Sequence, residues 1–142
     1  MTIGAILQGK GRDIASLPPS ASVEQAVALF AGRRIGAVPV VDDGAVVGIF
    51  SERDVVHCLA AQGAAALAQP LEAVMTRPVQ TVTAADPVIG ALSLMTRRRI
   101  RHLPVVDGDA LIGFVSIGDL VKYRIDRIEA DAAAMRDYIQ QG

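Results

Sequence analysis

Two short segments of this 142-residue chain place a serine hydroxyl and an aspartate carboxylate three residues apart. They are Ser51 with Asp54 and Ser116 with Asp119, and each pair directly follows an apolar run. If a helix begins at each serine, both side chains lie on one side of its first turn, beside unpaired backbone N–H groups. The carboxylate could accept hydrogen bonds from two ribose hydroxyls, while the N–H groups and the serine could bind a phosphate.

The same spacing also describes a capping box, in which the two side chains satisfy the N–H groups of their own helix. An isolated copy favours this purely structural role. Two copies inside a longer shared pattern favour a ligand site, and one serine can cap the helix and bind a ligand at different times.

Positive charge gathers in the segment from Arg97 to Pro104, which contains four arginines and His102. Guanidinium groups bind phosphate oxygens two at a time, and a histidine adds a donor whose charge changes near neutral pH. Arg97 to Arg99 are predicted to complement the C-terminus of a helix. Arg101 and His102 follow the predicted end of that helix, so we expect them to line a binding site.

An internal repeat contains all of these features. Residues 14–58 align without gaps on residues 79–123 at a constant offset of 65, and fifteen of the 45 aligned pairs are identical. The alignment places Gly36 and Ala37 where the second copy has Arg101 and His102.

The first copy would therefore take its phosphate contacts from other cationic side chains, namely Arg53, Arg33 or Arg34. We expect two clefts of different affinity, with the cleft built on Ser116 and Asp119 as the better anion binder.

Each copy has the pattern of a helix, two strands and a second helix. Apolar residues at i, i+3, i+4 and i+7 predict amphipathic helices from Val23 and from Val88. Ser20 or Ser22 could cap the first helix, and Asp86 followed by Pro87 could cap the second. Two β-branched runs joined by an Asp/Gly turn come next.

With a short strand before each helix, the order in each copy is β-α-β-β-α. The predicted fold class is therefore α+β, with two pseudo-twofold-related repeats packed sheet to sheet and a cleft between them. We expect repeats at 10–65 and 79–124, a linker at 66–78 and a C-terminal helical extension at 125–142.

The C-terminal stretch predicts one long helix with an apolar stripe. Its apolar residues recur at alternating steps of four and three, at Val121, Ile125, Ile128, Ala132, Met135 and Ile139. The stripe spans about two and a half heptads, fewer than a confident coiled-coil prediction needs. Either the helix folds back on its own domain or it pairs across a homodimer, together with Ile3, Ile6 and Leu7.

The two copies resemble the cystathionine β-synthase (CBS) domain, whose tandem pair is called a Bateman module. The resemblance rests on a Pro-Val-Val-Asp strand (39–42 and 104–107) and a Gly-x-x-Ser-x-x-Asp junction (48–54 and 113–119), and it covers about residues 10–124. It implies a regulatory module that binds AMP, ADP or ATP between the repeats, or less often S-adenosylmethionine, NAD-type dinucleotides or metal ions. It implies no obligatory cofactor. Such modules often dimerise and act on an effector, which we expect here to be a separate, unknown protein.

The resemblance also assigns residues to the site. In similar modules the aspartate holds the ribose, residues at the positions of Arg101 and His102 face the ligand, and Thr76 aligns loosely with a hydroxyl that touches it. Apolar residues of the type that sandwiches an adenine, although most such residues are core, are Val38, Ile49, Leu103 and Phe114. Their backbone groups could also read the base edge.

Other features narrow the functional class. A net charge of −1 provides no overall field for nucleic acid or an anionic membrane. His57 and Cys58 are adjacent, so on a helix they point about 100° apart and form a poor nucleophile–base pair. Two histidines and one cysteine are too few for a protein-only zinc site. No phosphate-loop motif occurs, and the absence of a signal peptide or a long apolar run predicts a cytoplasmic protein.

Three hypotheses follow. The first is an adenine-nucleotide sensor, with NAD(H) or S-adenosylmethionine as alternative ligands that the cationic residues favour less. The second is a scaffold that binds no ligand and interacts through its C-terminal helix. The third, an enzyme that turns over a nucleotide, has no catalytic constellation in its support.

Overall fold

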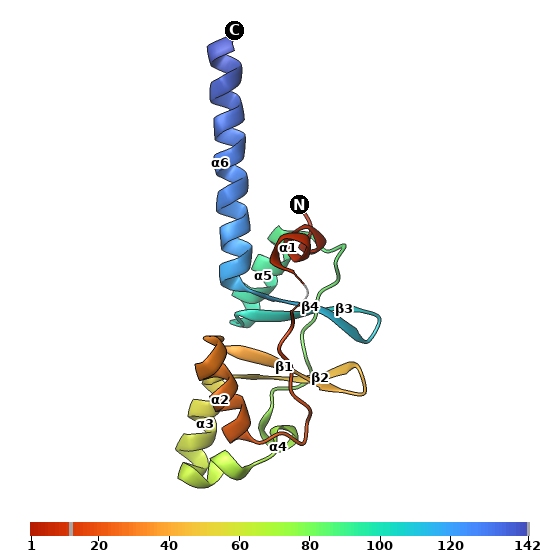
Figure 1. The fold of residues 1–142 in the computed structure, drawn as a ribbon, viewed down its shortest axis with the longest axis vertical. Helices are drawn as coiled ribbons and strands as arrows, with labels where there is room; N and C mark the ends of the chain where they lie inside the picture. The colour runs from red at the N-terminus through yellow and green to blue at the C-terminus, as the bar shows by residue number, and fades with distance from the viewer. Residues whose placement is uncertain (12, 142) are drawn as a thin grey trace.

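The computed structural model describes residues 1–11 and 13–141 (Figure 1). Arg12 and Gly142, which belong to the predicted first repeat and C-terminal extension, lie outside the described residues. The elements, in chain order, are α1 (Ile3–Lys10), α2 (Val23–Arg33), β1 (Ala37–Asp42), β2 (Ala45–Ser51), α3 (Glu52–Gln62), the 3-10 helix η1 (Gly63–Ala68), α4 (Leu71–Val74), α5 (Val88–Arg98), β3 (His102–Asp107), β4 (Ala110–Ser116) and α6 (Ile117–Gln141).

Two antiparallel hairpins, β1–β2 and β3–β4, form the centre of the molecule. Both show the same register shift, after Val40 and after Val105, which lie 65 residues apart. The hairpins join edge to edge in the order β1-β2-β4-β3, and the junction is the single pair Ala45 with Ala110. The predicted α+β class, with two repeats and a C-terminal helix, is confirmed.

The short strand expected at the start of each repeat is reduced to one parallel bridge. Leu17 bridges to Val40 in the first repeat, and Val82 bridges to Val105 in the second. A single bridge is enough to lay the incoming chain along the hairpin edge. β1 and β3, each of which contains a proline, therefore have a full strand partner along one edge and only this single bridge along the other.

Each repeat has its own hydrophobic core, and segments outside the repeat also contribute residues to that core. The first core contains Phe30, Phe50 and Leu71, and the second contains Met95 and Leu120, all of them buried. Segment 66–78, predicted as a linker, contributes both Ala66 and Leu71 to the first core.

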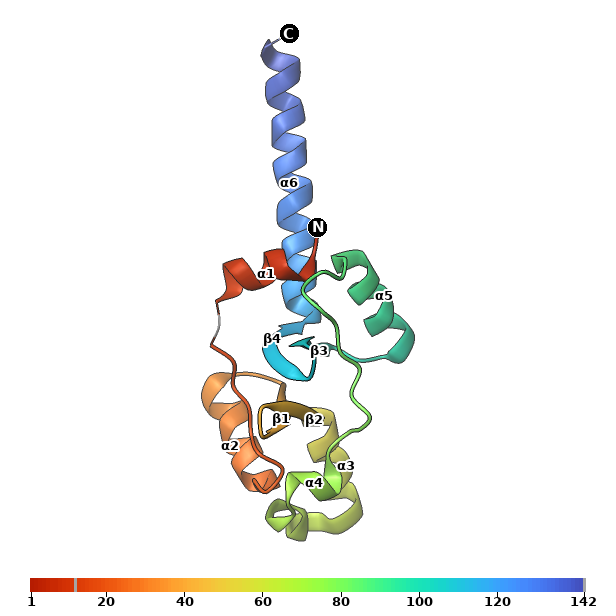
Figure 2. The same ribbon diagram turned by 90° about the vertical axis from the view of Figure 1, so that its right-hand side faces the viewer.

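The N-terminal helix α1 covers the second repeat, although the first repeat follows it in sequence (Figure 2). Ile3 has no exposed surface and Ile6 is buried in the second core. The expectation that these residues join a dimer interface was therefore wrong, because the core of their own chain already covers them.

The helix caps explain where the paired helices begin. Ser22 and Gln25 form a capping box at the start of α2. Pro87 occupies the equivalent position of α5 without a side-chain cap, and the Asp86 carboxylate instead accepts the Thr83 N–H at 2.8 Å. The Ser22 alternative was right, and the Asp86 cap was wrong because that carboxylate closes the preceding turn.

Helix α6 continues well beyond the body of the protein and projects from it in both ribbon views (Figures 1 and 2). Of its described residues, Leu120 alone is buried, and the apolar side chains beyond it are exposed or half-exposed. The helix does not fold back on its domain. Among the described helices, none combines the length and apolar character needed to cross a membrane.

We predict that Gly113→Ala destabilises the protein by about 1–3 kcal/mol, the usual cost of overpacking a core. A Cβ at Gly113 would stand 2.5 Å from Leu7 Cδ2, so the Leu7 side chain or the helix α1 that carries it would have to move. Chemical denaturation measures the loss. With Leu7→Ala added, the combined loss should be smaller than the sum of the two single losses.

Gly9→Ala is the matched control, because its added Cβ meets nothing within 4 Å and Gly9 lies in α1, the helix that also contains Leu7. It should leave stability unchanged or raise it by up to about 1 kcal/mol. Additive losses in the Gly113 and Leu7 pair would contradict the contact.

Candidate functional site

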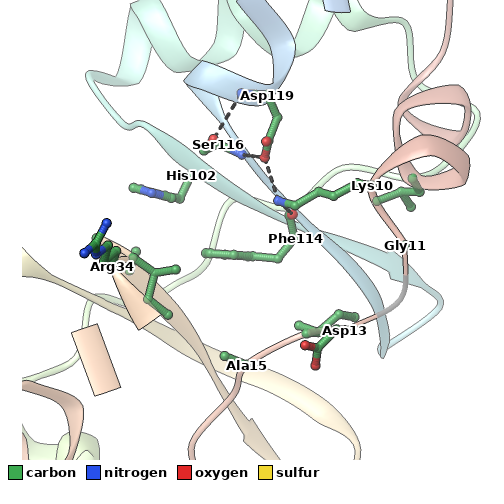
Figure 3. A pocket seen from close by; sticks show the side chains of 14 residues that line it. Lys10, Gly11, Asp13, Ala15, Arg34, His102, Phe114, Ser116 and Asp119 are labelled. Carbon is green, nitrogen blue, oxygen red and sulfur yellow. Dashed lines mark hydrogen bonds and ion pairs between the residues drawn. The ribbon is translucent and has the colours of Figure 1, made fainter. Parts of the chain in front are cut away.

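Two adjoining clefts lie between the repeats. The larger cleft, of about 830 Å³, contains Ser51, Asp54 and Thr76. The smaller cleft, of about 390 Å³, contains Ser116, Asp119 and Phe114 (Figure 3). Both volumes fall in the range of small-molecule sites.

Each cleft takes its helix start from one repeat and much of its opposite wall from the other. Asp54 of the first repeat shares the larger cleft with the segment Arg98–His102 of the second. Asp119 of the second repeat shares the smaller cleft with Arg34–Ala37 of the first, a segment that also borders the larger one. The pseudo-twofold arrangement therefore brings together residues about 45 to 85 positions apart in the sequence.

Both serine–aspartate pairs form reciprocal capping hydrogen bonds. The Ser51 N–H donates to Asp54 Oδ2 at 2.9 Å, and the Ser116 N–H donates to Asp119 Oδ2 at 2.8 Å. The aspartate N–H groups donate in return to the serine hydroxyls at 3.3 and 3.1 Å. The capping alternative is thus realised in both copies, and it holds each carboxylate at the wall of a cleft.

Asp54 retains the capacity to accept further hydrogen bonds. Its second oxygen, Oδ1, accepts the Thr76 hydroxyl at 3.0 Å. Thr76 is fixed there because its backbone exchanges hydrogen bonds with Ile49. A carboxylate offers about four acceptor sites, so capping does not exhaust those of Asp54.

Asp119 is held by a cation that sequence reasoning missed. Lys10 Nζ, at the end of α1, lies 2.6 Å from Asp119 Oδ2 and donates to the Phe114 carbonyl at 2.7 Å (Figure 3). Burial would raise the pKa of Asp119, but the hydrogen bonds from Lys10 and Ser116 outweigh it, and the pKa lies below its usual value.

A sequence signal for Lys10 did exist. Ile3, Ile6 and Leu7 repeat the spacing of Leu71, Val74 and Met75, but at an offset of 68 instead of 65. A gapless search at one offset cannot detect this correspondence between the segments that cover the two repeats.

His102 lies where the two clefts meet and stacks on Phe114, with ring centroids 5.6 Å apart and planes inclined by 11°. Burial and the nearby charge of Lys10 lower the pKa of His102, against the opposing effects of Asp119 and Glu52. The imidazole is therefore neutral at pH 7, which suits a stacked ring and leaves it able to take up a proton beside an anion.

Arginines line the larger cleft. Those among its described residues are Arg34, Arg53, Arg98, Arg99 and Arg101. Arg53 Nη1 donates to the Arg99 carbonyl at 3.3 Å and so links the two repeats.

Arg34 and Arg99 occupy equivalent positions at the ends of α2 and α5, and both have left-handed backbones with φ of 55° and 54°. Glycine is the usual residue at such a position because a side chain there costs energy. Both arginines line the larger cleft despite this cost, which points to a use for their side chains.

The structure redistributes the predicted cationic residues. Arg101 lies in the cleft of Asp54, and His102 borders both clefts, whereas we had expected both to serve Asp119. We had expected the Asp119 cleft to be the better anion binder, but more arginines line the Asp54 cleft, because the repeats face each other across the pseudo-twofold axis. Arg33 instead pairs with Asp13 at the surface, at 3.5 Å.

The predicted apolar contacts divide in two. Ile49 lines the larger cleft and Phe114 the smaller. Val38 and Leu103 have no exposed surface and belong to the two cores, so their side chains cannot reach a ligand in this arrangement. Their side chains face the cores because neighbouring side chains along a strand point to opposite faces. A contact of their backbone groups with the base edge stays a prediction.

Nothing in the described residues gathers three metal-ligating side chains into a cluster. His57 lines the larger cleft, whereas Cys58 is buried in the first core, where burial raises the pKa of its thiol. The two neighbours therefore face different surroundings.

Comparison with known proteins bears on both repeats. The family model of the CBS domain matches residues 11–61 and 71–126. A CBS-domain containing protein from Agrobacterium tumefaciens has a crystal structure that is similar to this chain, with a TM-score of 0.83 and 40% sequence identity. That match covers 87% of this chain and 99% of the other.

Two further structures contain small molecules. A CBS domain protein from Pyrobaculum aerophilum, complexed with AMP, is 29% identical with a TM-score of 0.74, over 84% of this chain and 89% of the other. The CBS domain pair of protein MJ0100, in complex with 5′-methylthioadenosine and S-adenosyl-L-methionine, is 25% identical with a TM-score of 0.79, over 89% of this chain and 98% of the other.

We predict that Lys10→Met raises the pKa of Asp119 and lowers stability at pH 7 by about 1 kcal/mol or less, the value of a partly exposed ion pair. A lowered folded-state pKa stabilises the protein above the unfolded value near 3.9 and ceases to do so as pH falls through the folded value. The stability difference between wild type and variant should therefore be largest at neutral pH and vanish in acid.

Denaturation between pH 3 and 7, with an NMR titration of Asp119, measures both effects. Arg33→Met is the matched control, because it removes a cation from the more exposed pair with Asp13 and should change neither quantity. An Asp119 titration unchanged in Lys10→Met would contradict the assignment.

Proposed function

Because the chain belongs to the CBS domain family and carries the domain in tandem, we propose that it is a regulatory sensor of adenine nucleotides. AMP, ADP or ATP would bind chiefly in the larger cleft. The observation that carries the proposal is that Asp54 of the first repeat, hydrogen-bonded to Thr76, lines the same cleft as the arginines contributed by the second repeat.

The larger cleft offers a group for each part of a nucleotide. Asp54 would accept the ribose hydroxyls while Thr76 keeps the carboxylate in position. Ile49 provides an apolar surface for the base. Arg99 and Arg101 would pair with phosphate oxygens, which favours a phosphorylated ligand over the cationic S-adenosylmethionine.

The smaller cleft would serve as a weaker second site. Lys10 already neutralises the Asp119 carboxylate through Oδ2, the oxygen that also caps the helix, so a ribose would bind Oδ1 or share Oδ2 with this ammonium group. The stacked pair of His102 and Phe114 provides a flat apolar surface beside it.

Signalling would follow from the thin connection between the repeats. The hairpins are joined by one residue pair, Ala45 with Ala110, so a ligand that contacts both repeats can bias their relative angle. The available energy is the difference in ligand affinity between the two arrangements. We propose that the sensor is a homodimer, that it acts in the cytoplasm, and that a separate effector protein responds to the change.

A scaffold role is the competing function, favoured by the exposed face of α6. It requires neither cleft to bind a ligand. An enzymatic role would require turnover of ATP or a dinucleotide by the purified protein, and the sensor proposal predicts none.

We predict that AMP, ADP or ATP at about a hundred times its dissociation constant raises the free energy of unfolding by about 2.7 kcal/mol. The melting temperature should rise by several degrees. Thermal unfolding with each nucleotide, NADH and S-adenosylmethionine identifies the ligand, in protein freed of bound nucleotide.

Asp54→Ala and Asp119→Ala are matched variants, since each removes one capping box. Asp54→Ala should abolish most of the ligand-induced shift, and Asp119→Ala should leave most of it. A shift with none of the ligands would favour the scaffold, and a larger loss in Asp119→Ala would reverse the order of the clefts.

We also predict that nucleotide affinity rises as pH falls from 8 to 6.5. A bound phosphate raises the pKa of His102, so binding takes up a proton that the free protein lacks at pH 7. Calorimetry in two buffers of different ionisation enthalpy measures the proton uptake. His102→Gln should remove the part that comes from the protein, and equal uptake in both proteins would contradict the role of His102.

A further inference from the structure

We propose that the exposed face of α6 binds the α6 helix of a second copy of this chain as a parallel, two-stranded coiled coil. This inference specifies the dimer of the proposed function and depends on no ligand. The CBS family model ends at residue 126, so most of the paired segment lies outside the region that the family model matches.

The apolar stripe of α6 is exposed along its length. Ile125, Ile128 and Ile139 are 49%, 55% and 68% exposed, and Val121 and Met135 are exposed as well. Their common face has no covering segment among the described residues, because α6 projects away from the body (Figures 1 and 2). Most of the stability of a helix in a protein comes from packing of its amphipathic face, and the face of α6 has no such packing within this chain.

The stripe has the period of a two-stranded seam. If Ile125 takes position a of a heptad, the a positions are Ile125, Ala132 and Ile139, and the d positions are Val121, Ile128 and Met135. The period defines the seam, whereas the number of strands is not selected by residue type, because β-branched residues occupy both a and d positions. The small Ala132 lets the helices approach closely in the middle of the seam.

The charges beside the seam select the parallel orientation. In parallel dimers, each g residue faces the e residue of the following heptad on the other helix. Here Arg124 at g faces Glu129 of the second copy, and Asp131 at g faces Arg136. Twofold symmetry doubles each pair, so every complete g–e contact joins opposite charges.

The antiparallel orientation brings like charges together. Packing Ile128 against Ala132 in that orientation aligns e with e and g with g. Glu129 then faces Glu129 of the second copy, and Asp131 faces its own counterpart. Lys122 faces Arg136, which is again a repulsive pair.

Self-complementarity also argues for a second copy over an unrelated partner. A twofold interface uses one surface patch twice, so its charges must match themselves after rotation. The pattern of Arg124, Glu129, Asp131 and Arg136 meets this condition in one orientation only. The two bodies would then lie at the same end of the helix pair.

Reversal of the charge pairs tests the inference on the full-length protein. Arg124→Glu and Glu129→Arg should each weaken the dimer at least about fivefold, because each converts two attractive pairs into repulsive ones. The double variant should recover the wild-type affinity, measured by analytical ultracentrifugation at low salt. Asp126→Arg, at position b on the outer face, is the control and should have no effect.

A disulfide tests the orientation. In a parallel pair, Ile139→Cys sets two thiols side by side, and mild oxidation should link the chains. In the antiparallel pair, residue 139 of one chain would lie opposite residue 121 of the other. The two thiols would then be about 27 Å apart along the helix axis. Wild-type protein, whose Cys58 is buried, is the control.

Ile128→Asp separates this interface from any other. It should give a monomer whose nucleotide-induced thermal shift is retained. A persistent dimer in Ile128→Asp, a wild-type mass of one, three or four chains, or failure of the charge-reversed double variant to recover would each overturn the inference. The absence of a nucleotide-induced thermal shift in the wild type would contradict the sensor proposal but not the helix pair.

Discussion

The single residue pair between the hairpins is the constraint on which both clefts depend. Ala45 and Ala110 hold β2 against β4 at one end, while the other ends of the strands diverge toward the helix starts. Residues at those ends, among them Ser51 and Ser116, therefore surround open space instead of a core. A continuous ladder between β2 and β4 would close the space in which Asp54 meets the arginines.

The helix starts combine stability with binding chemistry. Reciprocal hydrogen bonds with the serines fix the rotamers of Asp54 and Asp119, so each carboxylate faces its cleft before any ligand arrives. Preorganisation of this kind lowers the ordering cost of binding. The two sites differ in what else holds the carboxylate, which is a hydroxyl at Asp54 and an ammonium group at Asp119.

Much of this architecture could be predicted from one sequence because it is local or repeated. The amphipathic period of α2 and α5 and the Asp/Gly turns lie within short windows, and the constant 65-residue offset shows each of them twice. The contacts across the pseudo-twofold axis do not lie within short windows, because they join residues far apart in the sequence. Arg101 is 18 residues from Asp119 but faces Asp54, which is 47 residues away, and periodicity contains no information on that choice. The contact of Lys10 with Asp119 was not predicted for a related reason, since α1 covers the repeat that is more distant in sequence.

Helix α6 begins at the smaller cleft and continues into the projecting part of the molecule. Asp119 lies in the first turn of α6, and the same helix continues without a break to Gln141. A helix of 25 residues is about 37 Å long, so a small rotation at its start moves its far end by several ångströms. If the far ends are tied to each other in a dimer, that rotation is resisted, and the dimer favours one arrangement of the repeats. Linkage is reciprocal, so a ligand that favours the same arrangement must also tighten the dimer. The extension would thereby make the sensor respond to its own concentration as well as to its ligand.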